Sequence, residues 1–256
     1  MISGVTLISR AVDLGYPLQA CLEALAEVAS EIVVNVDVGV PDDGTMALTE
    51  TTQKRLGIPL RIVPSVWNHQ NRSAGTEVSI QTNIAFEAAT QPWLLLAQCD
   101  ELIHEEDAEH IRWLTTLPDE YAGAEFTRLY FWKDGATIRT DWTMPLVRLI
   151  RRGRGKAVED GMSCQVEGKV WPVDEEGRPV LHHYSRTGDP ALIAKRISNN
   201  DEFHHDPATV NWPSRYSFEL KKFDSFSNEV GYIPEVPQSV LVPFTGSHPR
   251  AAVGLY

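Results

Sequence analysis

The sequence predicts an α/β protein with a mostly parallel mixed sheet flanked by helices, an added β-hairpin region and an irregular C-terminal tail. Strand-like and helix-like segments alternate from Val5 to Leu117, which is typical of a parallel sheet covered on both faces. After Pro118 the pattern changes to short strands separated by turns, which predicts hairpins attached to that sheet. The 256 residues fit one large domain.

Composition narrows the classes of function. The net charge of −12 argues against long-range attraction to an anionic membrane or to bare nucleic acid, so there is no strong case for binding duplex nucleic acid. No apolar run approaches the roughly 20 residues that cross a bilayer. The N-terminus also lacks the pattern of a secretory signal, so we expect a cytoplasmic protein. Three widely separated cysteines favour buried thiols over a disulfide framework or a metal site.

A strand, a helix and a second strand open the chain. Val5 to Ile8 is the first predicted strand, and the polar turn after it begins with Ser9 and Arg10. Pro17 starts the helix, because proline is tolerated in a first helical turn. Glu31 to Asp37 is the second strand, so the segment predicts a right-handed βαβ unit.

The turn from Asp37 to Thr45 is rich in acidic residues and glycine. A carboxylate leaving a strand there could accept hydrogen bonds from a ribose or a base, and the alternative is a surface loop with an aspartate helix cap. A helix from about Met46 to Leu56 and a strand from Leu60 to Val63 follow. Pro64 to Gly75 is then a long loop, and long loops are often functional.

The next predicted helix runs from Val78 to Ala89, with Gln81 and Asn83 away from its apolar stripe. That stripe is Ile80, Ile84 and Ala88.

The most apolar strand runs from Trp93 to Cys99, where Gln98 is the one strongly polar side chain, which suits a strand buried on both faces. Asp100 and Glu101 follow where this strand leaves the sheet. Ligands bind at the carboxyl edge of open α/β sheets, so these carboxylates could hold a divalent cation against a phosphorylated ligand. The alternative is that they open the helix predicted from Glu105 to Leu117.

The second half is predicted to contain four strands and a helix. The first two strands, Glu125 to Trp132 and Leu146 to Ile150, are joined by a turn at Lys133 to Gly135. The other two, Lys169 to Val173 and Val180 to Tyr184, lie around a turn at Asp174 to Gly177. A helix is expected from Pro190 to Ser198, with an irregular tail beyond Asn199.

Several polar and aromatic residues of the second half are candidates for chemistry. Five basic residues fall within nine positions and could clamp phosphate or lie on a solvated face: Arg148, Arg151, Arg152, Arg154 and Lys156. Asp160, in a glycine-bounded turn beside Glu159, could be a general base or a turn former. Of His182 and His183, one should point to the ligand edge and one away, as metal ligands or as structural residues. Trp132 and Trp142 could stack on an acceptor sugar or lie in the core.

Taken in order, these segments resemble the family-2 inverting glycosyltransferases, which have the Rossmann-like GT-A fold. Asp37 to Thr45 is similar to their Asp-Asp-Gly-Ser-Thr-Asp-Gly-Thr turn, and Gly75 to Ala89 resembles their glycine loop and asparagine-containing helix. Trp93 to Glu106 is similar to the strand of their Asp-X-Asp motif, with Asp100 at the metal-binding position. The second half resembles a bacterial subset in the order of Arg128 to Trp132, Val147 to Arg152, Glu159-Asp160 and His183-Tyr184.

The resemblance implies transfer of a sugar, with inversion, from a UDP- or GDP-sugar to an unknown acceptor hydroxyl. It implies a nucleotide-sugar-binding half at 1–118, an acceptor and catalytic half at 119–200, and a C-terminal wrap at 201–256. Asp100 and His183 would bind Mn²⁺ or Mg²⁺, and Asp160 would be the base, with Glu159 in reserve. The implied donor-binding residues are Ser9, Arg10, Asp37, Asn83, Gln98, Arg148 and Arg151.

The sequence departs from the family pattern in two places: in the turn after Asp37, Val38 replaces the second aspartate and one residue is added, and the Asp-X-Asp motif is changed. Gln98 stands where the family has an aspartate, so the predicted metal site carries one negative charge fewer, and an imidazole ligand favours Mn²⁺ over Mg²⁺. Two other functions use the same residue types. One is a non-catalytic nucleotide-sugar-binding protein of this fold, and the other is a metal-dependent nucleotidyltransferase or phosphohydrolase.

Overall fold

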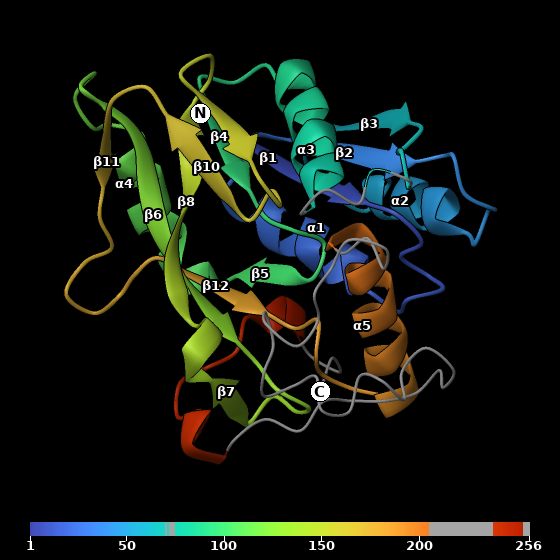
Figure 1. The fold of residues 1–256 in the computed structure, drawn as a ribbon. Coiled ribbons are helices and arrows are strands. Elements are labelled where there is room, and N and C mark those ends of the chain that lie inside the picture. Colours follow the sequence, from blue (N-terminus) through green and yellow to red (C-terminus); the bar gives the residue numbers. More distant parts are fainter. Residues whose placement is uncertain (70, 72–74, 205–237, 253–256) are drawn as a thin grey trace.

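The computed structural model describes residues 1–69, 71, 75–204 and 238–252 (Figure 1). Nine strands form the central sheet: β1 (Ile2–Ile8), β2 (Glu31–Asp37), β3 (Leu60–Ser65), β4 (Trp93–Leu96), β5 (Glu101–Ile103), β6 (Tyr121–Tyr130), β8 (Met144–Arg151), β11 (Lys169–Trp171) and β12 (Val180–His183). Their order is β3-β2-β1-β4-β8-β6-β12-β5, with β11 also beside β6. The helices are α1 (Leu18–Ala26), α2 (Thr45–Gln53), α3 (Thr76–Ala88), α4 (Ala108–Leu114) and α5 (Pro190–His204).

The predicted α/β class is confirmed. β1 pairs in parallel with β2 and with β4, and β2 pairs in parallel with β3. The carboxyl ends of these four strands therefore lie at one edge of the sheet. β8 runs antiparallel to β4 and to β6, so the sheet is mixed, as the change of pattern after Pro118 predicts.

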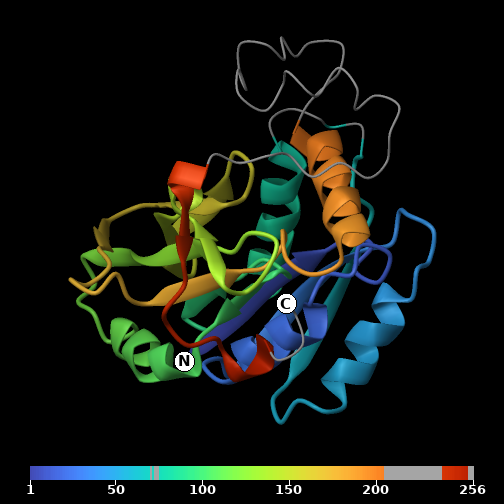
Figure 2. The ribbon, with the colours of Figure 1, turned by 90° about the horizontal axis from the view of Figure 1, so that it is seen from below.

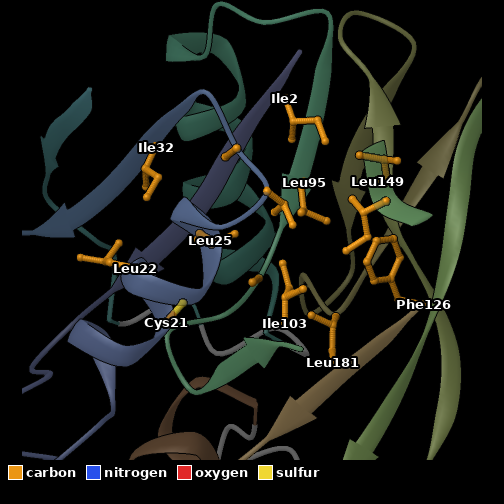
Figure 3. Packing of buried hydrophobic residues seen from close by; sticks show 14 of the residues in the cluster. Ile2, Cys21, Leu22, Leu25, Ile32, Leu95, Ile103, Phe126, Leu149 and Leu181 are labelled. Atoms are coloured by element: carbon orange, nitrogen blue, oxygen red, sulfur yellow. The ribbon is translucent and has the colours of Figure 1, made fainter. Parts of the chain in front are cut away.

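Two hydrophobic clusters fill the two faces of the sheet. α1, α2 and α4 cover one face (Figure 2), and Figure 3 shows Leu25, Leu95 and Leu149 among the side chains packed there. On the other face lie α3 and a hairpin of β9 (Gly155–Val158) and β10 (Ser163–Val166). Leu94 and Leu96 point to that second face, because side chains alternate along a strand.

The buried face of α3 is not the predicted one. Ile80 is 43% exposed, and the other two members of the predicted stripe are only half-buried. Gln81 is buried instead: its amide nitrogen donates to Glu77 at 2.7 Å, and its carbonyl oxygen accepts from the hydroxyl of Ser65 at 2.8 Å. Hydrogen bonds satisfy these buried polar groups, so the buried face of α3 combines this polar network with the apolar side chains of Ala85 and Phe86.

The predicted hairpin around Asp174 to Gly177 is wrong. β11 and β12 do not pair with each other, because each runs parallel to a different stretch of β6. At ten residues, β6 offers an edge long enough for both. The sequence also gave no sign of β5, which runs antiparallel to β12, because three residues are too few for a period-two pattern.

The last described segments differ in part from the predicted irregular tail. α5 continues to His204, so the helix is longer than predicted, and residues 205–237 and 253–256 of the expected tail lie outside the described residues. In segment 238–252, β13 (Leu241–Pro243) pairs with β7 (Thr137–Arg139). The described part of the chain contains no helix long and apolar enough to cross a bilayer.

Candidate active site

A pocket of about 290 Å³ lies at the sheet edge where β4 ends. Its walls come from the turn after β1, from the residues after β4, from β6 and β8, from the β9–β10 turn and from the end of β12. They are formed by Tyr16, Val78, Gln98, Asp100, Arg128, Tyr130, Trp142, Met144, Asp160, Met162, His183, Ser185 and Arg186. Four residues chosen from the sequence, Gln98, Asp100, Asp160 and His183, thus meet in one pocket.

Asp100 lies in the turn between β4 and β5. Its backbone carbonyl accepts a hydrogen bond from the Tyr184 amide at 2.8 Å, which ties this turn to the end of β12. The side chain is 10% exposed. Burial, and then the neighbouring carboxylate of Glu101, raise the pKa of Asp100 to about 6. At neutral pH the residue therefore carries a poorly solvated negative charge, which suits a cation.

His183 faces Asp100 from β12. Its Nε2 atom lies 3.6 Å from Oδ2 of Asp100, and its ring stacks on Tyr130 at a centroid distance of 4.5 Å. Burial, and then the nearby charge of Arg128, hold the pKa of His183 well below its usual range, so the imidazole is neutral and able to bind a metal. His182 points to the opposite side, against the ring of Phe131 at 5.4 Å, which is the alternation that the sequence predicts.

Asp100 and His183 fit two ligands of one divalent cation. Bonds of about 2.1 Å from an ion reach atoms up to about 4.2 Å apart, which exceeds the 3.6 Å between Oδ2 and Nε2. No group of three or more His, Cys, Asp or Glu side chains suited to a metal occurs in the described residues. A cation held here would therefore take most of its ligands from a substrate and from water, as Mg²⁺ bound with phosphates usually does.

Asp160 occupies the turn of the β9–β10 hairpin. Its Oδ1 atom accepts a hydrogen bond from the Met162 amide at 3.1 Å, and the side chain lines the pocket. Glu159, the reserve base, is exposed, has a left-handed backbone (φ 53°) and does not line the pocket. The geometry thus favours Asp160 over Glu159.

Ser9 and Asp37 meet at the carboxyl ends of β1 and β2. The Ser9 hydroxyl donates to Oδ2 of Asp37 at 2.8 Å, and Nε2 of His69 lies 2.6 Å from the same oxygen. Oδ1 of Asp37 accepts from the backbone amides of Gly39 at 2.8 Å and Trp67 at 3.2 Å. Asp37 is thus buried and orders the loop after β3.

Two further donor-binding candidates make structural contacts outside the pocket. Arg10 has a left-handed backbone (φ 55°) and donates to the side chain of Asn199 in α5. Asn83 forms two hydrogen bonds to the backbone of Ala157 in β9, accepting at 2.9 Å and donating at 3.0 Å. Asn83 therefore joins α3 to the hairpin that carries Asp160.

We predict that Asn83→Ala lowers the free energy of unfolding by about 1–3 kcal/mol, because it leaves two backbone groups without partners. It should also lower turnover through the loosened hairpin, without weakening donor binding. Urea unfolding and calorimetry with donor measure the two effects, with Glu87→Ala on the exposed side of α3 as the control. Weakened donor binding at unchanged stability would instead place Asn83 at the donor.

The predicted arginine cluster does not gather at the pocket. Arg148 is wholly buried, does not line the pocket, and donates from Nη2 to Oε1 of Glu101 at 2.7 Å. Arg151 lies beside Trp93, at the start of β4 and thus at the opposite edge from Asp100. There Arg151 donates to the backbone carbonyls of Tyr121 and Leu117. The predicted role in donor binding accounts for neither the contacts of Arg148 nor those of Arg151.

The Arg148–Glu101 pair yields a prediction for stability. Nε and Nη1 of Arg148 have no partner in the described residues, so Glu101→Gln would leave a buried cation uncompensated. We expect a loss of about 3–5 kcal/mol in the free energy of unfolding. The control, Glu120→Gln, removes an exposed ion pair with Lys169 and should cost less than about 1 kcal/mol. Equal urea midpoints for the two variants would contradict the prediction.

The sequence reasoning missed two arginines of the pocket. Arg128 and Arg186 are 4% and 8% exposed and line it, as does Tyr16, whose pKa is raised by burial and by the charge of Asp100. Arg128 lies near the end of β6, and nothing in the local sequence shows that its side chain enters the pocket without an ion-pair partner among the described residues. Of the two tryptophans considered, Trp142 lines the pocket and Trp132 is buried.

No protein-family model matches the sequence, and no curated protein sequence matches it. Among solved structures, the chain is similar to S. aureus TarS 1-349 in complex with UDP, with 15% identity, a TM-score of 0.47 and coverage of 89% of this chain and 78% of that one. A longer S. aureus TarS structure has 14% identity and a TM-score of 0.46, covering 78% of this chain and 38% of that one. The mannosyltransferase PcManGT from Pyrobaculum calidifontis, in complex with GDP-Man and Mn²⁺, has 12% identity and a TM-score of 0.48, covering 78% and 62%.

Proposed function

We propose that the chain is a glycosyltransferase of the GT-A, family-2 type, moving a sugar from a UDP- or GDP-sugar to an acceptor hydroxyl with inversion. The observation that carries this proposal is the pocket at the carboxyl edge of the sheet. There Asp100 and His183, paired at 3.6 Å, and Asp160 converge from three distant segments. The order of these residues along the chain agrees with the resemblance drawn from the sequence.

On the donor side, Asp100 and His183 would hold the cation, and Arg186, which lines the same pocket, would bind the diphosphate. The cation, when bound, stabilises the negative charge that gathers on the diphosphate as the glycosidic bond breaks. The positive charges of Arg128, Arg186, Arg148 and Arg196 all act on His183, so a cation is poorly accommodated without an anionic partner. A cation held by Asp100 and His183 would therefore be favoured by the negative charge of a bound diphosphate. Gln98, which lines the pocket, contributes to nucleotide binding, while Ser9 and Asp37 order the loops beside it.

On the acceptor side, Asp160 removes the proton of the attacking hydroxyl. Its Oδ1 atom is held by the Met162 amide, while Oδ2 makes no hydrogen bond among the described residues and is available for the proton. A single displacement with inversion needs such a base on the face of the sugar opposite the leaving group. Asp160, on the hairpin that covers the sheet edge, supplies it.

A thermal-shift screen of nucleoside-diphosphate sugars, with and without Mn²⁺, tests this proposal. We expect a UDP- or GDP-sugar to raise the melting temperature, and Mn²⁺ to increase that shift, because binding to the folded state stabilises it. Binding without transfer to any acceptor would support a non-catalytic nucleotide-sugar-binding protein. Donor cleavage that no acceptor affects would support a phosphohydrolase. Failure of every nucleotide to bind would overturn the proposal.

A further inference from the structure

We infer that the acceptor carries an anionic group, a phosphate or a carboxylate, close to the reacting hydroxyl, and that Arg128 binds that group. This inference rests on the proposed function and names the class of acceptor that the same pocket takes.

Arg128 is a buried cation that forms no direct ion pair in the described residues, although its charge acts on the carboxylate of Asp100 in the same pocket. The side chain is 4% exposed and lines the pocket. Its Nη1 atom contacts the Met162 sulfur at 3.1 Å, and a thioether is a weak acceptor. Its Nε atom is buried without a hydrogen-bond partner among the described residues. Burying a guanidinium with so little compensation is costly, and an anionic ligand in the pocket would offset that cost.

Three other buried arginines have an anionic partner or several backbone acceptors within the chain, although Nε and Nη1 of Arg148 lack hydrogen-bond partners in the described residues. Arg196 donates to the backbone carbonyls of Leu14, Gly15, Ser185 and Thr187. Arg139 forms a bidentate ion pair with Asp141, with N···O distances of 2.8 and 3.0 Å. Arg148 pairs with Glu101 at 2.7 Å. These arginines are structural, whereas the guanidinium of Arg128 is directed to the space where substrates bind.

The neighbours of Arg128 place it on the acceptor side. Met162, which it contacts, donates its backbone N–H to Asp160, so the arginine lies beside the proposed base. Its guanidinium lies 5.3 Å from the centroid of the Tyr130 ring, and Trp142 meets that ring edge-on at 4.8 Å. Aromatic rings next to a cation suit a sugar or polyol that also bears an anion.

Arg186 belongs to the other side of the pocket. It follows β12 and acts electrostatically on Tyr16 and Arg196, and Tyr16 lies in the segment between β1 and α1. Arg128 also acts electrostatically on Asp100 and His183, so it lies between the proposed cation site and the proposed base. We assign Arg186 to the diphosphate of the donor and Arg128, through its contact with Met162, to an anion on the acceptor. A guanidinium binds phosphate and carboxylate through the same paired N–H donors, so both sources are tested.

The test is calorimetric titration of sulfate into the full chain saturated with UDP and Mg²⁺. We expect sulfate to bind without displacing UDP. Arg128→Gln should weaken sulfate binding at least about tenfold, because charge-assisted hydrogen bonds are lost, and Arg128→Lys should weaken it less. Arg112→Gln, an exposed change on α4, should have no effect. Titrations of glycerol 3-phosphate and glucuronate, compared with glycerol and glucose, then distinguish phosphate from carboxylate.

Three results would overturn the inference: sulfate that competes with UDP, sulfate that fails to bind the UDP complex, or sulfate binding unchanged in Arg128→Gln. If Arg128→Gln does not fold, two measurements test the inference instead: sulfate binding to Arg128→Lys, and competition between sulfate and UDP for the wild-type chain. Failure of UDP itself to bind would count against the proposed function. Arg128-dependent sulfate binding to the UDP-free chain would then still establish the anion site.

Discussion

Replacing Asp100 with alanine is expected to abolish sugar transfer while leaving the protein folded. Asp100 is one of the two side chains proposed to bind the cation, 3.6 Å from His183, and no group of three or more such side chains suited to a metal occurs in the described residues. Its removal takes away a large share of the charge that holds the cation against the diphosphate. Transfer should fall below detection in an assay for released nucleoside diphosphate.

The stability of this variant is part of the prediction. Because burial raises the pKa of Asp100 to about 6, its ionised form disfavours folding at neutral pH, so the Asp100→Ala variant should melt no lower than the wild type. Asp119→Ala, which changes an almost fully exposed carboxylate, is the matched control and should keep full activity. Normal transfer by a well-folded Asp100→Ala protein would remove the central assignment.

Replacing Asp160 with asparagine is expected to leave donor affinity within about twofold and to lower turnover by about 10²–10⁴-fold, the usual contribution of a general base. The amide keeps the shape of the side chain and can still accept the Met162 hydrogen bond, so the hairpin should stay in place. Single-turnover kinetics with saturating donor isolate the chemical step.

The same experiment on Glu159→Gln decides between the two neighbouring carboxylates. Glu159 is exposed and does not line the pocket, so this variant should turn over at nearly the wild-type rate. A large loss in Glu159→Gln with little change in Asp160→Asn would transfer the role of base to Glu159. A loss of donor affinity in Asp160→Asn would move Asp160 to the donor side.

Much of the site followed from local rules. The carboxyl ends of parallel strands meet at one edge, which brought Ser9, Asp37 and Asp100 to the same edge of the sheet. Side-chain alternation along β12 separated His183 from His182. Both rules use only the geometry of a single strand and the direction of its neighbours, so one sequence is enough to apply them.

The arginines required knowledge of tertiary structure. Arg148 and Arg151 are three residues apart on β8, which is about 10 Å along an extended strand, and β8 runs antiparallel to β4. Arg151 is thereby carried to the edge away from Asp100, and Arg148 turns into the core beneath the hairpin. Arg128, which no local pattern distinguishes, lies in the pocket because β6 pairs with β12 there. A count of basic residues in a window cannot separate these three environments.

The pairing of β4 with β8 has a consequence for any attempt to shorten the chain. β4 is apolar on both sides and is held between β1 and β8, and the turn after it is tied to Tyr184 and Arg148. In a fragment ending near residue 118, β4 would be an apolar edge strand without its partner β8, and an unpaired apolar edge is a template for aggregation. A fragment of the first 118 residues should therefore precipitate unless β8 is supplied in trans or the exposed edge of β4 is redesigned with charged residues.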